Sequence, residues 1–285
     1  MTILKKGYPL FSVAICVYGK DNPDWFDEAL KSIVEQTVKP DEIVLVVDGP
    51  IPAKIQSVIN KYHQICERMT FNVIYFTENQ GHGNARRAGL EACKNELVAL
   101  MDADDICVGD RFEQQLKFYA EHDVDIVGGD IAEFIGTIDN VVAYRNVPIT
   151  DSDIKTFMKK RCPFNQMTVM FKKNSVQKAG GYIDWYCDED YYLWLRMAQD
   201  DCTMMNTGTI LVNVRVGKDM YNRRGGKKYF QSEAKLQKYM LDNKIIGIGT
   251  YLTNVYKRFI IQVLLPNRVR GWVFKKFARK RCKDV

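Results

Sequence analysis

Two carboxylates spaced two residues apart follow directly on five apolar residues near the middle of the chain. The apolar run is 97–101, and the carboxylates are Asp102 and Asp104. Side chains at i and i+2 point to one side if the extended backbone of the predicted strand continues. Two such carboxylates can hold Mn²⁺ or Mg²⁺, which in turn can bridge a diphosphate. The same spacing recurs at 123/125, 151/153 and 188/190, but only the 102/104 pair ends a fully apolar strand. A solvated turn that caps the next helix is the alternative.

Two further polar segments follow predicted strands. Asp48 follows the predicted strand 42–47, where its carboxylate can accept hydrogen bonds from a nucleobase or a ribose, and Gly49 leaves room for a ligand. Residues 78–87 place a glycine loop and two arginines at a helix start, where backbone N–H groups and a guanidinium can meet phosphate or base. A simple turn aspartate and a solvated helix arginine are the alternatives, and we favour the second for Arg87.

A third acidic cluster, residues 188–190, stands just before a predicted helix. Acidic residues are favourable at any helix N-terminus, so a purely structural role is the alternative. The neighbouring aromatic residues favour a functional one, because Tyr182 and Trp185 precede the cluster. Aromatic rings beside a carboxylate suit a sugar-binding floor with a general base, for which Asp190 is the candidate.

The elements that must position these residues alternate between apolar runs and helical patterns. Predicted strands cover residues 11–17, 42–47, 71–76, 97–101, 126–129, 168–171 and 210–216. Predicted helices cover residues 23–34, 53–68, 84–93, 110–121 and 190–198. This order is typical of an α/β protein with a mostly parallel sheet, whose ligands collect beyond the carboxyl ends of the strands. We predict one domain over residues 1–220, followed by a separate region, 221–285.

Six segments together resemble the inverting family-2 glycosyltransferases of the GT-A fold. In chain order they are SVAICVYGKD, EIVLVVDGP, NQGHGNARRAG, LVALMDADD, AGGY and DEDYYLWLR, and the resemblance spans about residues 11–196. It is closest to bacterial enzymes of capsule, exopolysaccharide and O-antigen synthesis. The resemblance implies a nucleotide-diphospho-sugar transferase fold, with a mostly parallel central sheet and helices on both faces.

The resemblance also implies roles for single residues. Asp48 is similar to the base- or ribose-binding aspartate, and Arg86 to the arginine of the family's Asn-x-Gly-x-x-x-x-Arg loop. Asp102 and Asp104 match the DxD motif, with Asp104 as the direct metal ligand, and Asp190 matches the general base. We further assign to the nucleotide-sugar site Val17, Tyr18, Asn79, Gly81 and Ala103. We assign to the acceptor site Tyr182, Trp185 and Glu189.

The activity implied is transfer of a hexose or N-acetylhexosamine from a nucleotide diphosphate sugar, with UDP as the carrier by resemblance. The acceptor would be a saccharide or a lipid-linked saccharide. Many relatives carry two aspartates where this chain has Val47-Asp48, and the Gln-x-x-Arg-Trp signature of processive members is absent. We therefore expect addition of one residue per acceptor. Arg223 and Arg224, in a glycine-containing loop, could close on the diphosphate as a lid, or the loop could be an ordinary surface turn.

The net charge of +6 is concentrated near the C-terminus. Residues 257–283 carry ten basic residues and no acidic one, interleaved with apolar side chains, which predicts a basic amphipathic helical segment. We expect it to contact an anionic membrane, the alternatives being a helix packed on the domain or a tail. No run of eighteen apolar residues and no signal peptide pattern occurs, and eight cysteines without a CxxC pair suit a reducing compartment. The predicted location is cytoplasmic, at the inner face of the cell membrane, and no nucleic acid partner is expected.

Two other classes of protein remain as alternatives. A dinucleotide-binding oxidoreductase would use a strand at 73–76, the glycines at 81 and 83, and Asp102 about twenty residues further on. Against it, Arg86 stands where the third glycine of that fingerprint belongs. A noncatalytic, membrane-associated scaffold is the other alternative, and the presence of both Asp104 and Asp190 speaks against it.

Overall fold

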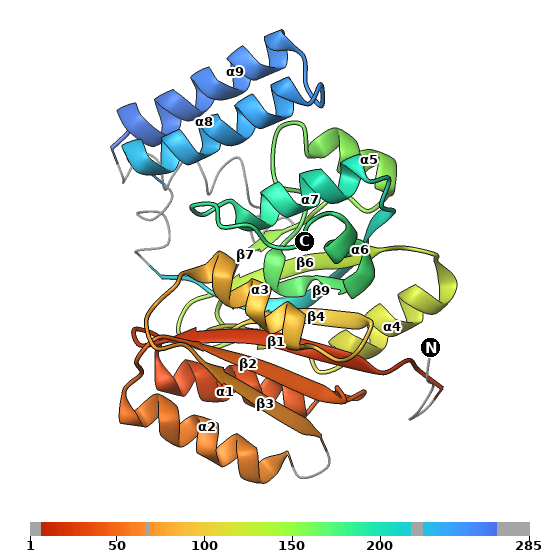
Figure 1. Cartoon of the computed structure of the whole chain (residues 1–285), viewed down its shortest axis with the longest axis vertical. Coiled ribbons are helices and arrows are strands. Elements are labelled where there is room, and N and C mark those ends of the chain that lie inside the picture. Colours follow the sequence, from red (N-terminus) through yellow and green to blue (C-terminus); the bar gives the residue numbers. More distant parts are fainter. Residues whose placement is uncertain (1–6, 67–68, 218–224, 267–285) are drawn as a thin grey trace.

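The computed structural model describes residues 7–66, 69–217 and 225–266. Within them, nine strands form one sheet in the order β3-β2-β1-β4-β8-β6-β9-β5, with β7 paired to β6 (Figure 1). The strands are β1 (Phe11–Tyr18), β2 (Glu42–Asp48), β3 (Thr70–Tyr75), β4 (Leu97–Asp102), β5 (Ile106–Cys107), β6 (Ile126–Phe134), β7 (Val141–Arg145), β8 (Met170–Lys172) and β9 (Met204–Arg215). The helices are α1 (Pro23–Val34), α2 (Ala53–Ile65), α3 (His82–Ala92), α4 (Arg111–Glu121), α5 (Asp151–Phe157), α6 (Lys173–Lys178), α7 (Glu189–Gln199), α8 (Lys227–Asp242) and α9 (Ile248–Phe259).

The predicted α/β fold with a mostly parallel sheet is confirmed. β1 pairs in parallel with β2 and β4, β2 with β3, and β6 with β9. β8 lies between β4 and β6 and runs antiparallel to both, so β4 and β6 share one direction. β5 and β7 are antiparallel edge partners of β9 and β6. The carboxyl ends of the long strands therefore meet along one edge of the sheet.

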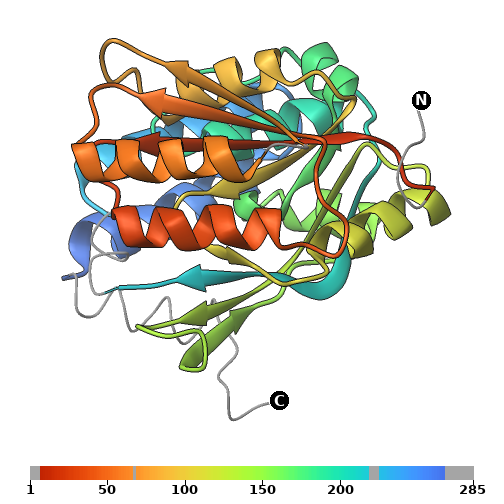
Figure 2. The same ribbon diagram turned by 90° about the horizontal axis from the view of Figure 1, so that it is seen from below.

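Helices cover both faces of this sheet, as expected. Alternate residues of β1 enter two different cores: Phe11, Val13, Ile15 and Val17 pack with α1, α2 and α4, while Ala14 packs on the other face. That second core is built from residues of α3, α5, α6, α7 and α8. Figure 2 shows α1 and α2 side by side on one face, with the sheet between them and the second layer. Each face of the sheet is thus sealed by its own helices, and this fixes where the strand ends point.

The end of β1 is joined to α1 by a well-capped turn that holds one wall of the site. Asn22 is the N-cap: its side-chain oxygen accepts hydrogen bonds from the backbone N–H groups of Asp24 and Trp25, at 2.9 and 3.3 Å. Pro23 occupies the first turn, where its missing N–H costs nothing. The helix has the bounds predicted from the sequence.

The second half of the chain departs from the prediction in detail. β6 is nine residues long where four were expected, and β9 begins at Met204, six residues before the expected start. β5, β7, α5 and α6 were not predicted at all. The first half agrees closely, with strand and helix ends shifted by one to three residues.

Beyond the sheet, α8 and α9 form an antiparallel pair that lies over the edge of the sheet near α7 (Figure 1). They belong to the predicted C-terminal helical region. Ser232 of α8 donates a hydrogen bond to the carbonyl of Tyr186, and Asn254 of α9 donates one to the carbonyl of Lys159 at 2.9 Å. The pair is therefore bound to the segments before α7 and after α5. None of the described helices is both long and apolar enough to cross a bilayer.

Candidate active site

The carboxyl ends of β1, β2 and β4 open onto a cleft of about 860 Å³. The cleft lies where the strand order reverses between β1 and β4, which is the usual ligand site of an open α/β sheet. Further walls come from the starts of α3 and α7, from α8, α9 and the turn after α9, from the ends of β7 and β9, and from the segment 160–167. The sequence-predicted site residues that line it are Tyr18, Asp48, Asn79, Gly81, Arg86, Asp102, Ala103, Asp104, Glu189 and Asp190.

Four carboxylates crowd the part of this cleft at the end of β4. Burial raises the pKa of Asp21 to about 6, and repulsion from Asp104 adds to the rise, although the Tyr18 N–H donates to Asp21 at 2.9 Å. Burial and then repulsion from Asp104 and Asp102 raise the pKa of the Asp105 carboxyl well above its usual range. Negative charge gathered in this way is stabilised by a cation.

Asp102 and Asp104 fit a divalent cation that is bound together with a substrate. Within the residues that the structure describes, no three His, Cys, Asp or Glu side chains are arranged to hold a metal by themselves. Mg²⁺ is usually bound by one or two carboxylates plus substrate phosphates and waters, and Mn²⁺ also prefers oxygen ligands. The donor set therefore has the chemistry for Mn²⁺ or Mg²⁺ that is held jointly with a diphosphate.

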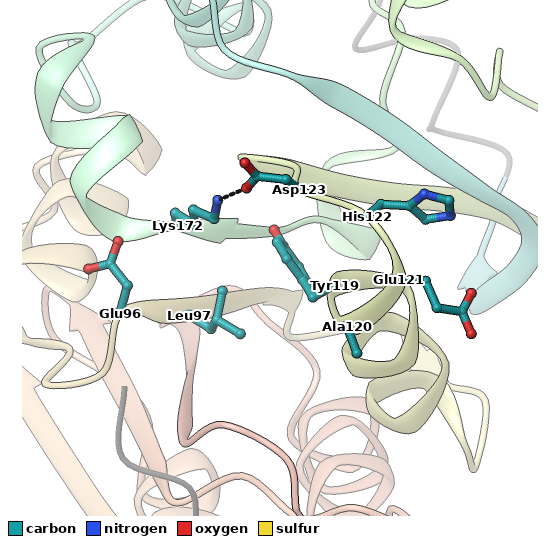
Figure 3. A pocket seen from close by; sticks show the side chains of 8 residues that line it. All are labelled: Glu96, Leu97, Tyr119, Ala120, Glu121, His122, Asp123 and Lys172. Carbon is teal, nitrogen blue, oxygen red and sulfur yellow. Dashed lines mark hydrogen bonds and ion pairs between the residues drawn. The ribbon is translucent and has the colours of Figure 1, made fainter.

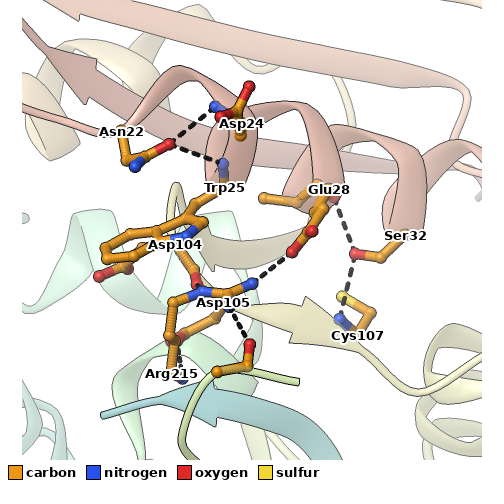
Figure 4. A network of polar contacts seen from close by, with 11 residues as sticks. Asn22, Asp24, Trp25, Glu28, Ser32, Asp104, Asp105, Cys107 and Arg215 are labelled. Carbon is orange, nitrogen blue, oxygen red and sulfur yellow. Dashed lines mark hydrogen bonds and ion pairs between the residues drawn. The ribbon is translucent and has the colours of Figure 1, made fainter. Parts of the chain in front are cut away.

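The loop after β4 is held in place by Arg215 at the end of β9 (Figure 4). The Arg215 backbone N–H donates to the Asp105 carboxylate at 2.9 Å, and its guanidinium donates to the Asp104 carbonyl at 3.3 Å. The same guanidinium lies 4.9 Å from the centre of the Trp25 ring and forms an ion pair with Glu28, both on α1. Arg215 thus fixes the acidic loop between α1 and β9. Sequence analysis did not identify it.

Arg86 joins two acidic motifs that lie far apart in the sequence. Its guanidinium donates to Asp102 at 3.0 Å and to Glu189 at 2.7 Å. Burial disfavours the charged guanidinium, but Asp102 and Glu189 outweigh it and raise the pKa of Arg86. Burial likewise opposes ionisation of Glu189, but His82 and Arg86 hold the pKa of its carboxyl below the usual range. Arg86 therefore ties the end of β4 to the start of α7.

Asp48 holds the glycine loop that precedes α3. Its carboxylate accepts hydrogen bonds from the backbone N–H groups of Gln80 and Gly81 at 2.7 and 3.0 Å, and from the Asn79 side chain at 2.9 Å. We expected Gly49 to leave room for a ligand, but the space is filled by protein. A Cβ on Gly49 would lie 2.7 Å from the Asn79 backbone nitrogen. Asp48 still lines the cleft, and a carboxylate can accept more than three hydrogen bonds.

The third acidic motif turns into the cleft at the start of α7. Cys187, just before it, has φ of 62°, a left-handed conformation that is uncommon for a residue with a side chain. Burial, and then repulsion from Glu189, raise the pKa of the Asp190 carboxyl to about 6. Its Oδ1 accepts a hydrogen bond from the Tyr191 N–H at 2.6 Å. Asp190 is thus a partly buried carboxylate whose pKa is shifted towards neutrality, as a general base requires.

The neighbouring Asp188 contacts helix α8. It is 4% exposed and accepts a hydrogen bond from the Ser232 hydroxyl of α8 at 3.1 Å. Burial, followed by repulsion from Glu233 and Asp190, raises the pKa of the Asp188 carboxyl well above its usual range. Asp188 therefore connects α8 to the acidic motif.

The C-terminal helices supply cleft residues that sequence analysis missed. Tyr229 and Glu233 of α8 and Lys257 and Arg258 of α9 line the cleft, together with Gln262. Arg258 forms an ion pair with Glu233, which keeps the two helices in register beside the site. The cleft thus spans the boundary that we predicted near residue 220. No local pattern marked these residues, since their role depends on a chain reversal between α8 and α9.

Some predicted site residues lie away from the cleft wall. Val17 is 1% exposed and packs into the core beneath β1. Tyr182 is also 1% exposed, and its hydroxyl accepts a hydrogen bond from Gln166 at 3.0 Å. Trp185 packs against Tyr192, with 4.4 Å between ring centres. Neither Tyr182 nor Trp185 is among the residues that line the cleft, so the structure does not place them where we expected an acceptor contact. Arg223 and Arg224 lie outside the described residues.

A second pocket, of about 360 Å³, lies at the opposite edge of the sheet, near the start of β4 and the end of α4 (Figure 3). Its polar groups serve the fold: Lys172 pairs with Asp123 at 2.9 Å, and the Tyr119 hydroxyl donates to the carbonyl of Met170 at 2.9 Å. It brings together no set of catalytic groups comparable to that of the cleft.

A sheet whose switch point faces the carboxylate pair Asp102 and Asp104, with the Asp190 carboxyl of raised pKa in the same cleft, is the arrangement of nucleotide-diphospho-sugar transferases with a GT-A fold. The chain belongs to glycosyltransferase family 2: residues 12–183 match the family described as glycosyl transferase family 2. The oxidoreductase alternative is thereby wrong. Its glycine loop follows β3 at the sheet edge, whereas a dinucleotide fingerprint follows the first strand beside the switch point.

Curated relatives match over almost their whole length. An uncharacterized glycosyltransferase of Haemophilus influenzae is 39% identical, covering 95% of this chain and 99% of that protein. A UDP-Gal:alpha-D-GlcNAc-diphosphoundecaprenol beta-1,3-galactosyltransferase of Escherichia coli is 36% identical over 95% of this chain and 98% of that protein. The amylovoran biosynthesis glycosyltransferase AmsE of Erwinia amylovora is 35% identical over 94% and 98%. Because the identity extends through the C-terminal helices, they belong to the shared architecture.

Solved structures agree on the fold. A mannosyltransferase from Pyrobaculum calidifontis, in complex with GDP-Man and Mn²⁺, superposes with a TM-score of 0.62 at 16% identity, over 93% of this chain and 72% of that one. Residues 1–349 of TarS from S. aureus, in complex with UDP-GlcNAc, give a TM-score of 0.64 at 16% identity, over 93% and 76%. At this level of identity the comparison establishes the shared fold.

Proposed function

We propose that this glycosyltransferase moves a hexose or N-acetylhexosamine from a UDP-sugar to a lipid-linked saccharide during synthesis of a bacterial surface polysaccharide. The observation that carries the proposal is that two acidic motifs line one cleft. Asp102 and Asp104 stand at the end of β4, and Asp190, with its pKa near 6, stands at the start of α7. The Escherichia coli relative, named for transfer from UDP-Gal to a diphosphoundecaprenol-linked sugar, supports the substrate class.

In the proposed donor site, the glycine loop held by Asp48 places Asn79 and Gly81 in the wall of the cleft, where they contact the nucleotide. Tyr18, at the end of β1, and Ala103 line the same wall. Asp102 and Asp104 would hold Mn²⁺ or Mg²⁺ together with the diphosphate, with Asp104 as the direct ligand. When bound, the cation supplies positive charge that stabilises the departing nucleoside diphosphate.

In the proposed acceptor site, Asp190 removes the proton of the attacking hydroxyl. That oxygen forms a bond to the anomeric carbon of the donor sugar as the bond from this carbon to the diphosphate breaks. The electron pair leaves with UDP, the proton resides on the Asp190 carboxylate, and the anomeric configuration inverts. Glu189, held by Arg86, lies beside this base and faces the acceptor. The reaction adds one sugar for each acceptor molecule.

The proposal places the enzyme at the cytoplasmic face of the membrane, where lipid-linked acceptors present their sugars. The basic segment after residue 257 would contact anionic headgroups there. Support for the membrane contact comes from the charge distribution of the sequence, with ten basic and no acidic residues in 257–283. Anionic lipids attract such segments.

Binding and transfer test the proposal in turn. Isothermal titration of UDP, GDP and CMP with and without Mn²⁺ should show metal-dependent binding of one nucleoside diphosphate, UDP, which Asp104→Ala abolishes. Transfer from UDP-Gal, UDP-GlcNAc and GDP-Man to a GlcNAc-diphospholipid should then succeed with one UDP-sugar. Asp190→Asn should bind UDP normally but transfer no sugar. Preference for GDP, or transfer by Asp190→Asn at the wild-type rate, would overturn the assignment.

A further inference from the structure

The charged residues that line the cleft are sorted by sign according to the segment that carries them. Most of the carboxylates follow β1, β2 or β4 or stand at the start of α7. Five cationic residues come from other segments, and we call them the basic set: Arg145 at the end of β7, Lys160 and Arg161 after α5, and Lys257 and Arg258 on α9. The cleft therefore has a second charged region besides the carboxylates of β4.

Main-chain contacts gather the basic set on one short segment. Arg145 donates a hydrogen bond to the Cys162 carbonyl at 3.0 Å, and Arg258 donates one to the Lys160 carbonyl at 2.9 Å. The segment that accepts both hydrogen bonds also carries the side chains of Lys160 and Arg161. Residues of β7 and α9, which lie far apart in the sequence, are thus fixed around residues 160–162, and the basic set forms one group.

The lysines of the basic set carry positive charge that other side chains leave unneutralised. Lys160 and Lys257 are exposed, and neither is paired with a carboxylate among the residues that the structure describes. Glu233 pairs with Arg258. The pKa of the Asp188 carboxyl is raised well above its usual range by burial and then by repulsion from Glu233, which favours its neutral form. Ammonium and guanidinium groups gathered in this way suit an anion with several oxygens.

The basic set lies beside the carboxylate that we propose as the general base. Burial and Glu189 raise the pKa of Asp190, whereas the positive charges of Arg86 and Arg145 lower it. Because the interaction between charges weakens with distance, Arg145 must be close to Asp190. An acceptor whose hydroxyl is held at Asp190 would therefore bring the anionic group attached to its sugar to the basic set.

We infer that the basic set binds the diphosphate that joins the acceptor sugar to its lipid. The inference rests on the proposed function, in which the acceptor is a lipid-linked saccharide, and it names the residues that recognise the link. Guanidinium groups offer paired N–H donors to phosphate oxygens, and the lysines add point charges. The donor diphosphate binds elsewhere, because Asp102 and Asp104 hold phosphate only through a cation. The basic set needs no metal, and it distinguishes a diphosphate-linked acceptor from the same sugar on a neutral chain.

The first test compares two soluble acceptors with the same sugar and the same chain: the decyl diphosphate ester of GlcNAc and the decyl glycoside of GlcNAc. Wild type should prefer the diphosphate in kcat/KM. The glutamine variant, Lys160→Gln with Lys257→Gln, should raise the KM for the diphosphate acceptor about tenfold and reduce this preference accordingly, because two positive charges are lost. Lys160→Arg with Lys257→Arg keeps the charges and should retain the wild-type KM. The matched control, Lys54→Gln with Lys178→Gln, changes exposed lysines of α2 and α6 that do not line the cleft, and should behave as wild type.

The second test needs no sugar transfer. With UDP and Mn²⁺ present to fill the donor site, isothermal titration should show decyl diphosphate binding to wild type and to the control, and about tenfold weaker binding to the glutamine variant. UDP should bind all of these proteins equally. Weaker UDP binding by the glutamine variant would assign the basic set to the donor and overturn the inference.

Three other results would also refute the inference: equal binding of decyl diphosphate by wild type and the glutamine variant, an unchanged preference for the diphosphate acceptor, or an equal loss of activity with both acceptors. Because decyl diphosphate carries no sugar, its binding reports on the basic set even where transfer fails. Metal-dependent UDP binding tests the proposed function separately, so the two failures are distinguishable.

Discussion

At the scale of single residues, Asp190 has a carboxyl whose protonation can be followed in the rate of transfer. Its pKa lies at about 6 because the group is buried and next to Glu189. Only the ionised carboxylate can accept the acceptor's proton. The folded enzyme should therefore hold the active form above pH 6 and lose it as the pH falls through about 6.

We predict that kcat/KM for sugar transfer falls on the acid side with a midpoint near pH 6, and that Asp190→Asn lowers kcat by about 10²–10⁴-fold. The control is Asp21→Asn, because burial raises the pKa of Asp21 to about 6 as well. If Asp190 is the base, the acid limb persists in Asp21→Asn. If the fall in kcat/KM at acid pH disappears in Asp21→Asn, the pH dependence would belong to the carboxylates at the end of β4 and not to Asp190.

Arg86 gives a second prediction at this scale, since it connects two carboxylates that are themselves largely buried. Its side chain is 11% exposed, that of Glu189 9% and that of Asp102 26%. Removal of one partner from a buried ion pair leaves an uncompensated charge, at a cost of about 3–5 kcal/mol. We expect Arg86→Met to lower the free energy of unfolding in urea by this order.

The double variant Arg86→Met with Glu189→Gln should be less destabilised than the sum of the two single variants, because the stranded charge is gone. Arg86→Lys keeps the positive charge but cannot contact Asp102 and Glu189 at the same time. Its free energy of unfolding should therefore be closer to that of wild type than its kcat is. If the two single-variant losses in free energy of unfolding simply add in the double variant, Arg86 and Glu189 do not act as a unit. The link between Arg86 and Glu189 could not be predicted from sequence, because 103 residues separate them.

At the scale of elements, prediction succeeded where a strand is buried on both sides and failed where polar residues sit inside one. β1, β2 and β4 are largely apolar, and their ends located Asp48 and Asp102 correctly. β6 contains Gly128, Gly129 and Asp130, which resemble a turn. In the fold, Asp130 accepts a hydrogen bond from the Val147 N–H at 2.9 Å, and a Cβ on Gly128 would meet Phe164 at 2.7 Å. Tertiary contacts, not local pattern, made these residues part of a strand.

The docking of the glycine loop on β2 leads to a prediction for this element. Gly49 has φ of 88°, and a Cβ there would lie 2.7 Å from the Asn79 nitrogen. Gly49→Ala should therefore displace residues 78–81, destabilise the protein by roughly 3 kcal/mol and weaken UDP binding. Calorimetry and nucleotide titration measure the two effects.

The matched control is Gly136→Ala. Gly136 has a similar φ of 75°, but a Cβ there would meet nothing within 4 Å. This variant carries the backbone penalty alone, about 1 kcal/mol, and should bind UDP as wild type does. Equal loss of UDP binding in both variants would refute the idea that close approach of the loop, and not φ alone, requires glycine at position 49.

At the scale of the whole molecule, the fold joins two halves that each supply one end of the cleft. The part of the cleft formed by β1, β2 and β4 could be predicted because each motif ends its own strand. The part formed by α7, α8 and α9 depends on distant contacts, such as the hydrogen bond between Asp188 and Ser232, which are 44 residues apart. No periodicity or spacing reports such a contact. The sequence therefore predicts the metal and base candidates, but not the helices that enclose them.

The joint binding of cation and nucleotide should be visible in the stability of the whole protein. Asp104 repels both Asp21 and Asp105 in the folded chain, and a bound cation relieves this repulsion. A ligand that binds only the folded state at a hundred times its Kd adds about 2.7 kcal/mol. We therefore expect UDP with Mn²⁺ to raise the melting temperature by roughly 5–10 °C, and more than the sum of the shifts from UDP alone and Mn²⁺ alone. Asp104→Asn should abolish the excess shift while keeping the response to UDP alone. An undiminished shift in the presence of EDTA would show that the nucleotide binds without a metal, and that the carboxylates of β4 serve another purpose.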